Sequence, residues 1–109
     1  MKKAKAPISP EGLRVLAHLF RLLSEPSRLQ LLNALMPGEQ SVSQLVELTG
    51  KNQANVSKQL KTLSGGKILG RRRRGRQVFY HIADPAIVEL CHLLCGKMRV
   101  RFMPSKPRR

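Results

Sequence analysis

The sequence predicts a mainly helical α+β fold with a single β-hairpin, in the order α-α-α-α-β-β-α. Apolar residues recur at spacings of three and four through most of the chain, which is the period of an amphipathic helix. That pattern changes at residues 77–82, where strand-forming residues follow one another. With 109 residues and 41% hydrophobic content, the chain is long enough for one domain with a small core.

The first two helices are separated by Ser24-Glu25-Pro26. Proline fits the first turn of a helix and blocks continuation of the preceding one, so one helix should span residues 11–23 and the next residues 26–35. Pro37-Gly38 ends the second helix. The apolar stripe of the first comprises Leu13, Leu16, Leu19, Phe20 and Leu23. The expected buried side of the second comprises Leu29, Leu32 and Leu35.

Two further helices are predicted next, joined by a short turn. Ser41 and Gln44 match a capping box, in which each side chain bonds the other residue's backbone N–H, at the start of a helix over residues 42–48. Asn52 is the expected cap of a fourth helix over residues 53–64. The expected inward residues are Val42, Leu45 and Leu48 in the third helix and Val56, Leu60 and Leu63 in the fourth.

The remaining elements are a hairpin and a last helix. Ile68-Leu69 begins one strand, residues 77–82 form the other, and Arg74-Gly75 marks the turn between them. Asp84-Pro85 then starts a helix that runs to about residue 99, because Asp is a good cap and Pro fits the first helical position.

The two ends differ in composition from the middle. Lys, Arg and Pro dominate there, so we expect a flexible basic arm at residues 1–10, one domain at residues 11–100 and a flexible basic tail at residues 101–109. No stretch approaches the roughly 18 apolar residues of a membrane span, and the arm lacks the apolar segment of a signal peptide. We therefore expect a cytoplasmic protein with reduced cysteines and no membrane partner.

Positive charge dominates the chain, whose net charge is +15. Nine Lys or Arg residues lie between Lys51 and Arg76, and no acidic residue lies between Glu47 and Asp84. A helix and a hairpin that share one electrostatic sign suit a polyanion that they grip together. Double-stranded DNA is the predicted partner.

Helix, turn, helix, basic hairpin and helix together form a winged helix-turn-helix arrangement. In that geometry the second helix of the pair enters the major groove, and its first residues reach base edges. Gln53, Asn55 and Lys58 are therefore candidates for base contacts, while Ser57 and Lys61 suit phosphates. The competing interpretation of these residues is the solvated polar face of an amphipathic helix.

The hairpin carries five arginines, at positions 71 to 74 and 76. Alternate residues of a strand face opposite sides, so these five side chains cannot all contact DNA at once. Arg74 and Arg76, which flank Gly75, are the predicted contacts of the hairpin.

Four motifs carry a family resemblance. They are Leu23-Ser24-Glu25-Pro26-Ser27-Arg28-Leu29, Gln53-x-x-Val56-Ser57-x-x-Leu60-Lys61-x-Leu63, Arg74-Gly75-Arg76-x-Val78-Phe79-Tyr80 and Asp84-Pro85. With them, the chain resembles the ArsR/SmtB family of bacterial winged-helix repressors over about residues 16–96. The resemblance implies a homodimer through the first and last helices, and promoter binding that is relieved by an inducer, often a metal ion or an oxidant. A two-fold dimer predicts a pseudo-palindromic operator.

Several positions depart from the pattern of that family. Its arsenic- and cadmium-type site has Cys-Val-Cys where this chain has Ser41-Val42-Ser43, and hydroxyl groups bind soft metals poorly. Its zinc-type site begins Asp-x-His, whereas this chain has Asp84-Pro85-Ala86 and places Lys97 at the later His position. Lys67 stands where many relatives have Gly, and we expect Gly65-Gly66 to end the recognition helix instead.

Cys91 and Cys95 lie one turn apart on the predicted last helix and share a face. Three interpretations stay open for them: small core residues, a thiol switch that responds to oxidation, or ligands of a soft metal ion. Two thiols do not complete a tetrahedral site, so a metal would also need His92, His18 or the partner chain. No other cofactor is expected.

These features predict a sequence-specific DNA-binding repressor of its own operon, with thiol oxidation or soft-metal binding as the candidate release signal. Catalysis and a small-molecule substrate are not expected, because the six acidic residues are scattered and no nucleophile-base arrangement or phosphate loop is present. The alternative is a nucleoid-type or structural nucleic-acid-binding protein without sequence preference. Gln and Asn at the start of the recognition helix favour the repressor, since pure phosphate binding would not need them.

Overall fold

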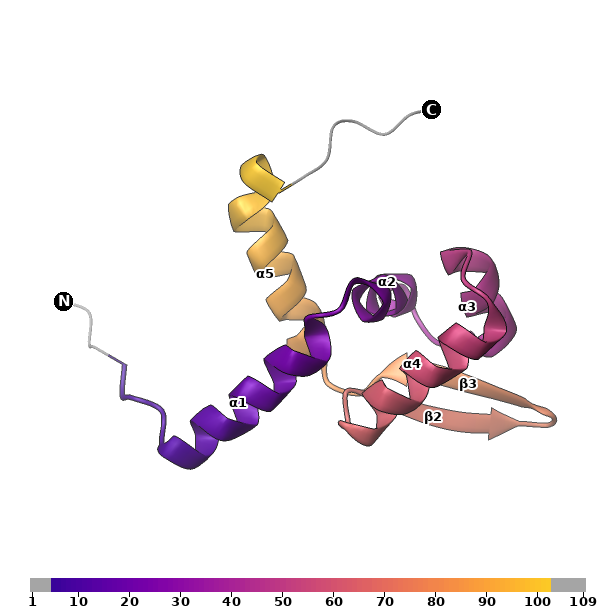
Figure 1. The fold of residues 1–109 in the computed structure, drawn as a ribbon, viewed down its shortest axis with the longest axis horizontal. Helices are drawn as coiled ribbons and strands as arrows, with labels where there is room; N and C mark the ends of the chain where they lie inside the picture. The colour runs from indigo at the N-terminus through magenta and orange to yellow at the C-terminus, as the bar shows by residue number, and fades with distance from the viewer. Residues whose placement is uncertain (1–4, 103–109) are drawn as a thin grey trace.

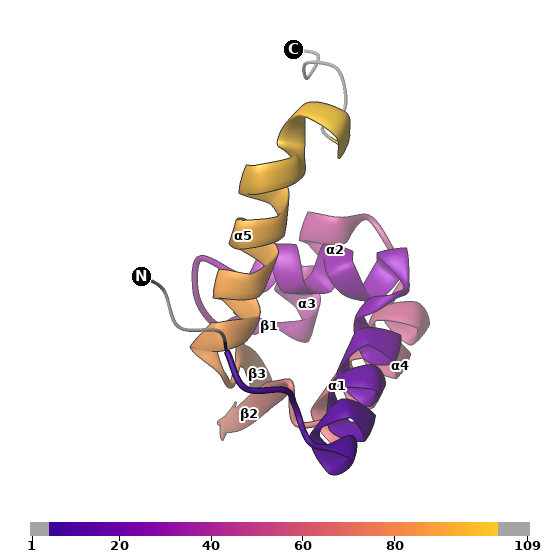
Figure 2. The ribbon, with the colours of Figure 1, turned by 90° about the vertical axis from the view of Figure 1, so that its left-hand side faces the viewer.

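The computed structural model describes residues 5–102, so the outer parts of the predicted arm and tail, residues 1–4 and 103–109, lie outside the described residues. The helices and strands are α1 (Pro10–Leu23), α2 (Pro26–Leu35), β1 (Gln40–Ser41), α3 (Val42–Thr49), α4 (Gln53–Gly65), β2 (Leu69–Arg74), β3 (Gln77–Ile82) and α5 (Pro85–Phe102). Figure 1 shows a winged helix-turn-helix in the predicted order. The short strand β1, labelled in Figure 2, is present in addition.

The two helices of the helix-turn-helix begin at their predicted caps. At α3, Gln44 N–H donates to Ser41 Oγ at 3.2 Å and Ser41 N–H donates to Gln44 Oε1 at 2.8 Å, which completes the capping box. At α4, Asn55 N–H donates to Asn52 Oδ1 at 2.8 Å. Gly50, with a φ of 72°, ends α3 in the left-handed conformation.

α4 ends at the predicted glycine pair, but the left-handed residue that follows it is a lysine. Gly66 has a φ of −87°, whereas Lys67 has a φ of 65°. Lys67 N–H donates to Ser64 C=O and Ile68 N–H donates to Leu63 C=O, each at 3.0 Å. These two bonds define a Schellman motif, in which the left-handed position is usually glycine. Lys67 therefore takes the left-handed position that glycine usually occupies in this motif.

The sheet is three-stranded and antiparallel, with β3 between β1 and β2. β1 pairs with β3 through Gln40 with Tyr80 and Ser41 with Phe79. β1 was not predicted from the sequence, because two residues are too few to show a strand period. β1 leads directly into α3 and pairs with β3 of the hairpin, so it connects the helix-turn-helix to the sheet.

The core lies between the helix-turn-helix, α2 and the sheet. Its buried members are Leu22, Leu23, Leu31, Leu32, Leu35, Leu45, Val56, Leu60, Leu63, Ile68, Leu69, Tyr80 and Ile87. The predicted burial of two residues is wrong: Leu29 of α2 is 43% exposed and Leu48 of α3 is 59% exposed. Leu31 takes the buried place in α2, because α3 and α4 pack on the side that carries it.

α1 and α5 project from the side of the molecule that lies opposite the hairpin tip (Figures 1 and 2). Much of the predicted stripe of α1 is exposed, including Leu13 and Phe20. Exposed leucines also occur on α5, at Leu93 and Leu94. Among the described helices, none is long and apolar enough to cross a membrane.

Candidate nucleic-acid interface

α4 buries one side and presents a polar, basic side to solvent. Val56, Gln59, Leu60 and Leu63 form its buried side. Of the predicted contact residues, Gln53, Lys58 and Lys61 are exposed, while Asn55 and Ser57 are half-buried. The predicted contacts are therefore accessible on one helix, with no acidic residue in the helix itself.

The register of the hairpin sorts its arginines onto two faces. Arg71 pairs with Tyr80 and Arg73 with Val78, so these two arginines leave the sheet on the face that carries the core and the helices. Arg72 pairs with Phe79, and with Arg74 it leaves on the opposite face. All of the hairpin arginines are exposed.

Glu39, which precedes β1, binds both arginines of the outer face. Arg72 Nη2 donates to Glu39 Oε2 at 2.7 Å, and Arg72 Nε donates to Oε1 at 3.3 Å. Arg74 Nη2 donates to the same Oε2 at 3.0 Å, while its guanidinium carbon lies 4.8 Å from the centre of the Phe79 ring. Residues 48–83 contain no acidic residue, so their counter-charge comes from Glu39, which the fold brings next to the hairpin.

The hydrogen bond from Arg72 holds the pKa of the Glu39 carboxyl below its ordinary value, and the positive charges of Arg72, Arg74 and His81 act in the same direction. Within the described residues, ion pairs occur only at Glu39. Arg71, Arg73 and Arg76 are thus the hairpin arginines that have no acidic partner in the described part of the chain.

Arg76 lies close to the first turn of α3. Together with Gln77 and Val78 of β3, it lines a cavity of about 230 Å³ whose other wall is Ser41-Val42-Ser43. The hairpin turn, the start of α3 and the start of α4 consequently lie on one side of the molecule (Figure 1). The exposed cations of this surface come from the hairpin and from α4, whereas α3 carries none.

The predicted thiol site is only partly described. Cys91 is half-buried on α5 and His92 is exposed, while the side chain of Cys95 lies outside the described residues. His18 of α1 lines a cavity of about 200 Å³ whose other lining residues include Asp84 and Ile87, one turn before Cys91 on α5. Among the side chains that the structure describes, no three His, Cys, Asp or Glu residues gather closely enough to hold a metal ion.

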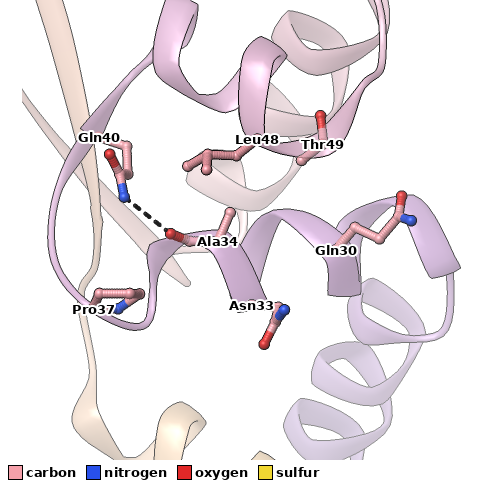
Figure 3. Close-up of a pocket in the computed structure, with 7 residues that line it drawn as sticks. All are labelled: Gln30, Asn33, Ala34, Pro37, Gln40, Leu48 and Thr49. Carbon is pink, nitrogen blue, oxygen red and sulfur yellow. Dashed lines mark hydrogen bonds between the residues drawn. The ribbon is translucent and has the colours of Figure 1, made fainter. Parts of the chain in front are cut away.

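A further cavity, of about 360 Å³, lies between α2, β1 and α3 (Figure 3). It is lined by Gln30, Asn33, Ala34, Pro37, Gln40, Leu48 and Thr49. Gln40 Nε2 donates to Ala34 C=O at 3.2 Å across it. Its lining contains amide and hydroxyl groups but no cation, so it does not extend the basic surface.

Three polar residues with long-range hydrogen bonds were not predicted from the sequence. Glu39 lies 33 positions from Arg72, and Arg28 lies 31 positions from its hydrogen-bond partner Gln59. Arg28 did stand inside a family motif, which was the one available signal for it. Neither pairing has a local pattern, because the partners meet only through the tertiary fold.

The segment that contains the helix-turn-helix matches a known protein family. A family model for bacterial regulatory proteins of the arsR family matches residues 25–65, which contain α2, β1, α3 and α4. The probable mercury resistance operon repressor of Streptomyces lividans is 35% identical over 77 residues, which cover 71% of this chain and 62% of that repressor. The chain spans 62% to 65% of the length of three curated relatives, this repressor among them.

Two solved structures agree with the described fold. The antimony-specific transcriptional repressor AntR is similar with a TM-score of 0.78 at 31% identity, over 88% of this chain and 88% of that chain. A homodimeric winged helix-turn-helix DNA-binding domain from Mycobacterium bovis, a possible ArsR-family regulator, has a TM-score of 0.75 at 26% identity. That similarity covers 96% of this chain and 99% of the other.

Proposed function

The chain belongs to the ArsR family of bacterial regulatory proteins, and from this premise we propose that it is a homodimeric repressor that binds operator DNA of its own operon. The single observation that carries the proposal is the surface formed by α4 and the hairpin, whose exposed lysines and arginines stand in elements that contain no acidic residue. A bacterial repressor meets its operator in the cytoplasm, which is the location we propose. Family membership supports a regulator and not an enzyme.

The proposed contacts on α4 divide by chemistry. Gln53, Asn55 and Lys58 are assigned to base edges in the major groove, because amide groups bond adenine bidentately and lysine bonds guanine. Ser57 and Lys61 are assigned to phosphates, which position the helix without reading sequence.

The proposed hairpin contacts are Arg74 and Arg76. Arg76 has no acidic partner among the described residues, whereas Arg74 must exchange Glu39 for a phosphate group. Arg71 and Arg73 are added to the proposal, since both leave the sheet on the helix side and neither is paired with Glu39.

Apolar side chains on α1 and α5 support the proposed homodimer. Val15 is 68% exposed and Leu93 is 55% exposed, and both belong to helices that project away from the hairpin. Pairing these helices across a two-fold axis would remove this apolar surface from water. The two copies of α4 would then meet successive turns of the major groove, about 34–36 Å apart, in a pseudo-palindromic operator.

A footprint on the DNA upstream of the protein's own gene, in the presence of competitor DNA, tests this function. We expect a short, symmetric protected site that survives competition. A binding affinity that falls steeply with salt concentration should accompany it, because a dimer that neutralises about 6–10 phosphates releases as many counterions. Uniform protection that competitor removes equally would instead support the nucleoid-type protein.

The proposed release signal acts at Cys91 and Cys95, with His92 as a further ligand if the signal is a soft metal ion. In the dimer the two copies of α5 would bring up to four thiols near the axis, which suits either oxidation or metal binding. Repeating the footprint after oxidation and after addition of a soft metal, with wild type, Cys91→Ser and Cys95→Ser, separates the two signals. Equal behaviour of all three proteins would leave the cysteines as packing residues.

A further inference from the structure

Arg28, in the first turn of α2, joins two other helices through one guanidinium group. Its Nη1 donates to Leu22 C=O at 3.1 Å, and its Nε donates to Gln59 Oε1 at 3.1 Å. Leu22 belongs to the last turn of α1, and Gln59 lies in the middle of α4. A single planar group therefore connects the helix that projects away from the hairpin with the helix that presents the DNA contacts.

The bond to Leu22 satisfies one of the carbonyl groups at the end of α1. The last four carbonyl groups of an α-helix have no partner inside the helix, and the helix dipole makes that end attractive to a cation. Arg28 supplies both the donor and the charge. The position of its guanidinium is thus fixed by the last turn of α1.

The bond to Gln59 satisfies a buried polar group. Gln59 is 9% exposed and lies on the buried side of α4 among Val56, Leu60 and Leu63. A buried amide without a partner is costly, and Arg28 is the side chain that satisfies its oxygen. Movement of α4 away from Arg28 would leave this buried amide oxygen without its partner.

A second contact holds the same two helices. A Cβ atom on Gly66 would lie 2.2 Å from Leu22 Cδ1, so the side chain of Leu22 packs directly on the backbone at the end of α4. Gln59 and Gly66 are seven positions apart, about two helical turns, and so lie on the same side of the chain path. Leu22 is therefore tied to α4 by a polar link through Arg28 and by direct packing at Gly66.

We propose that Arg28 is a positioning residue that sets the orientation of α4 from the position of α1. The inference rests on the proposed function, in which α1 contributes to the dimer interface and α4 contacts DNA. A change of dimer geometry that moves the last turn of α1 moves Arg28, and the amide of Gln59 must follow. Lys58 and Lys61, on the opposite side of α4, change their direction with it.

A double-mutant cycle on operator affinity tests the proposal. Arg28→Met removes both donors and keeps the length of the side chain, Gln59→Met removes the acceptor, and the double variant lacks both. We expect each single change to weaken binding to the footprinted DNA roughly tenfold, the size of one hydrogen bond to a charged group. The double variant should be no weaker than the weaker single variant, because both changes break the same link.

Four further measurements separate positioning from folding. Circular dichroism and sedimentation establish that each variant is folded and dimeric at the assay temperature. Gln59→Glu, whose carboxylate still accepts from Arg28, should keep near wild-type affinity. Arg21→Met, which removes an exposed charge next to Leu22, is the control for loss of charge. If Arg28→Met does not fold, the operator affinities of Gln59→Met and Gln59→Glu are compared instead. Both variants keep Arg28 and its bond to Leu22 at the end of α1.

Unchanged operator affinity in folded, dimeric Gln59→Met protein would overturn the inference, as would single effects that multiply in the double variant. Either result would leave Arg28 as a stabiliser of the fold. Wild-type protein that protects no specific site would overturn the proposed function itself, which is seen before any variant is compared.

Discussion

Lys67 donates its backbone N–H to Ser64 C=O at 3.0 Å from a left-handed backbone conformation, with a φ of 65°. A side chain with a Cβ is strained there by about 1–2 kcal/mol, because the Cβ approaches the following carbonyl oxygen. The bond persists because the Schellman motif and the buried pair Leu63 and Ile68 hold the chain on this path.

The first prediction concerns this strain. Lys67→Gly should raise the free energy of unfolding by about 0.5–1 kcal/mol, since the relief of strain exceeds the extra entropy of glycine in the unfolded chain. Urea unfolding followed by circular dichroism measures the change. Lys67→Ala is the matched control, because it removes the charge but keeps the Cβ, and it should give no comparable gain. Equal gains in both variants would mean that charge repulsion, and not backbone strain, is relieved.

The second prediction concerns the two arginines that Glu39 holds. Glu39→Gln should raise DNA affinity at low salt, because Arg72 and Arg74 become available to phosphates. The log–log salt dependence should steepen by about 0.9 for each additional phosphate that the hairpin neutralises. Exposed ion pairs contribute little to folding, so the unfolding free energy should hardly change.

Glu47→Gln supplies the control for the second prediction. It removes the same charge from α3, where the described residues show no ion pair to that carboxylate. A gain in affinity of equal size in both variants would show that only net charge matters. A loss of affinity in Glu39→Gln would show instead that Glu39 holds the hairpin in its binding position.

The third prediction concerns acid pH. The hydrogen bond from Arg72 lowers the pKa of Glu39, so the folded state favours the charged carboxylate more than the unfolded chain does. The contribution of this contact is therefore fully present above the ordinary glutamate pKa, and it is lost as the pH falls through the lowered value. Carboxyl NMR titration should find the pKa of Glu39 below the ordinary glutamate value, and Arg72→Gln should move it upward. A Glu39 pKa that Arg72→Gln leaves in place would contradict this cause.

Features that depend on residues close together in the chain can be predicted from the sequence. The capping box of Ser41 and Gln44 and the cap at Asn52 are readable because the partners lie three positions apart. The exposure of Leu29 could not be predicted, because leucines lie on more than one side of α2. Which of them are buried depends on how the other elements pack against α2. The same limit applies to the site. Its basic character follows from composition, whereas the pairing of Arg72 with Glu39 depends on the fold.

The last prediction concerns the apolar surface on the side opposite the hairpin. Leu93→Glu on α5 should weaken dimerisation at least about a hundredfold, because an uncompensated charge buried in an interface costs about 3–5 kcal/mol. The fold of each protomer should survive, since Leu93 is 55% exposed and does not belong to the core. Specific DNA binding should fall with the dimer, because one protomer reaches only one half-site.

Leu48→Glu is the matched control for this prediction, because Leu48 is similarly exposed, at 59%, but lies on α3 away from α1 and α5. Sedimentation velocity across a concentration series should find Leu48→Glu dimeric under conditions in which Leu93→Glu is monomeric. A dimeric Leu93→Glu protein would place the interface elsewhere, because a charge on an exposed face is tolerated only where water still reaches it.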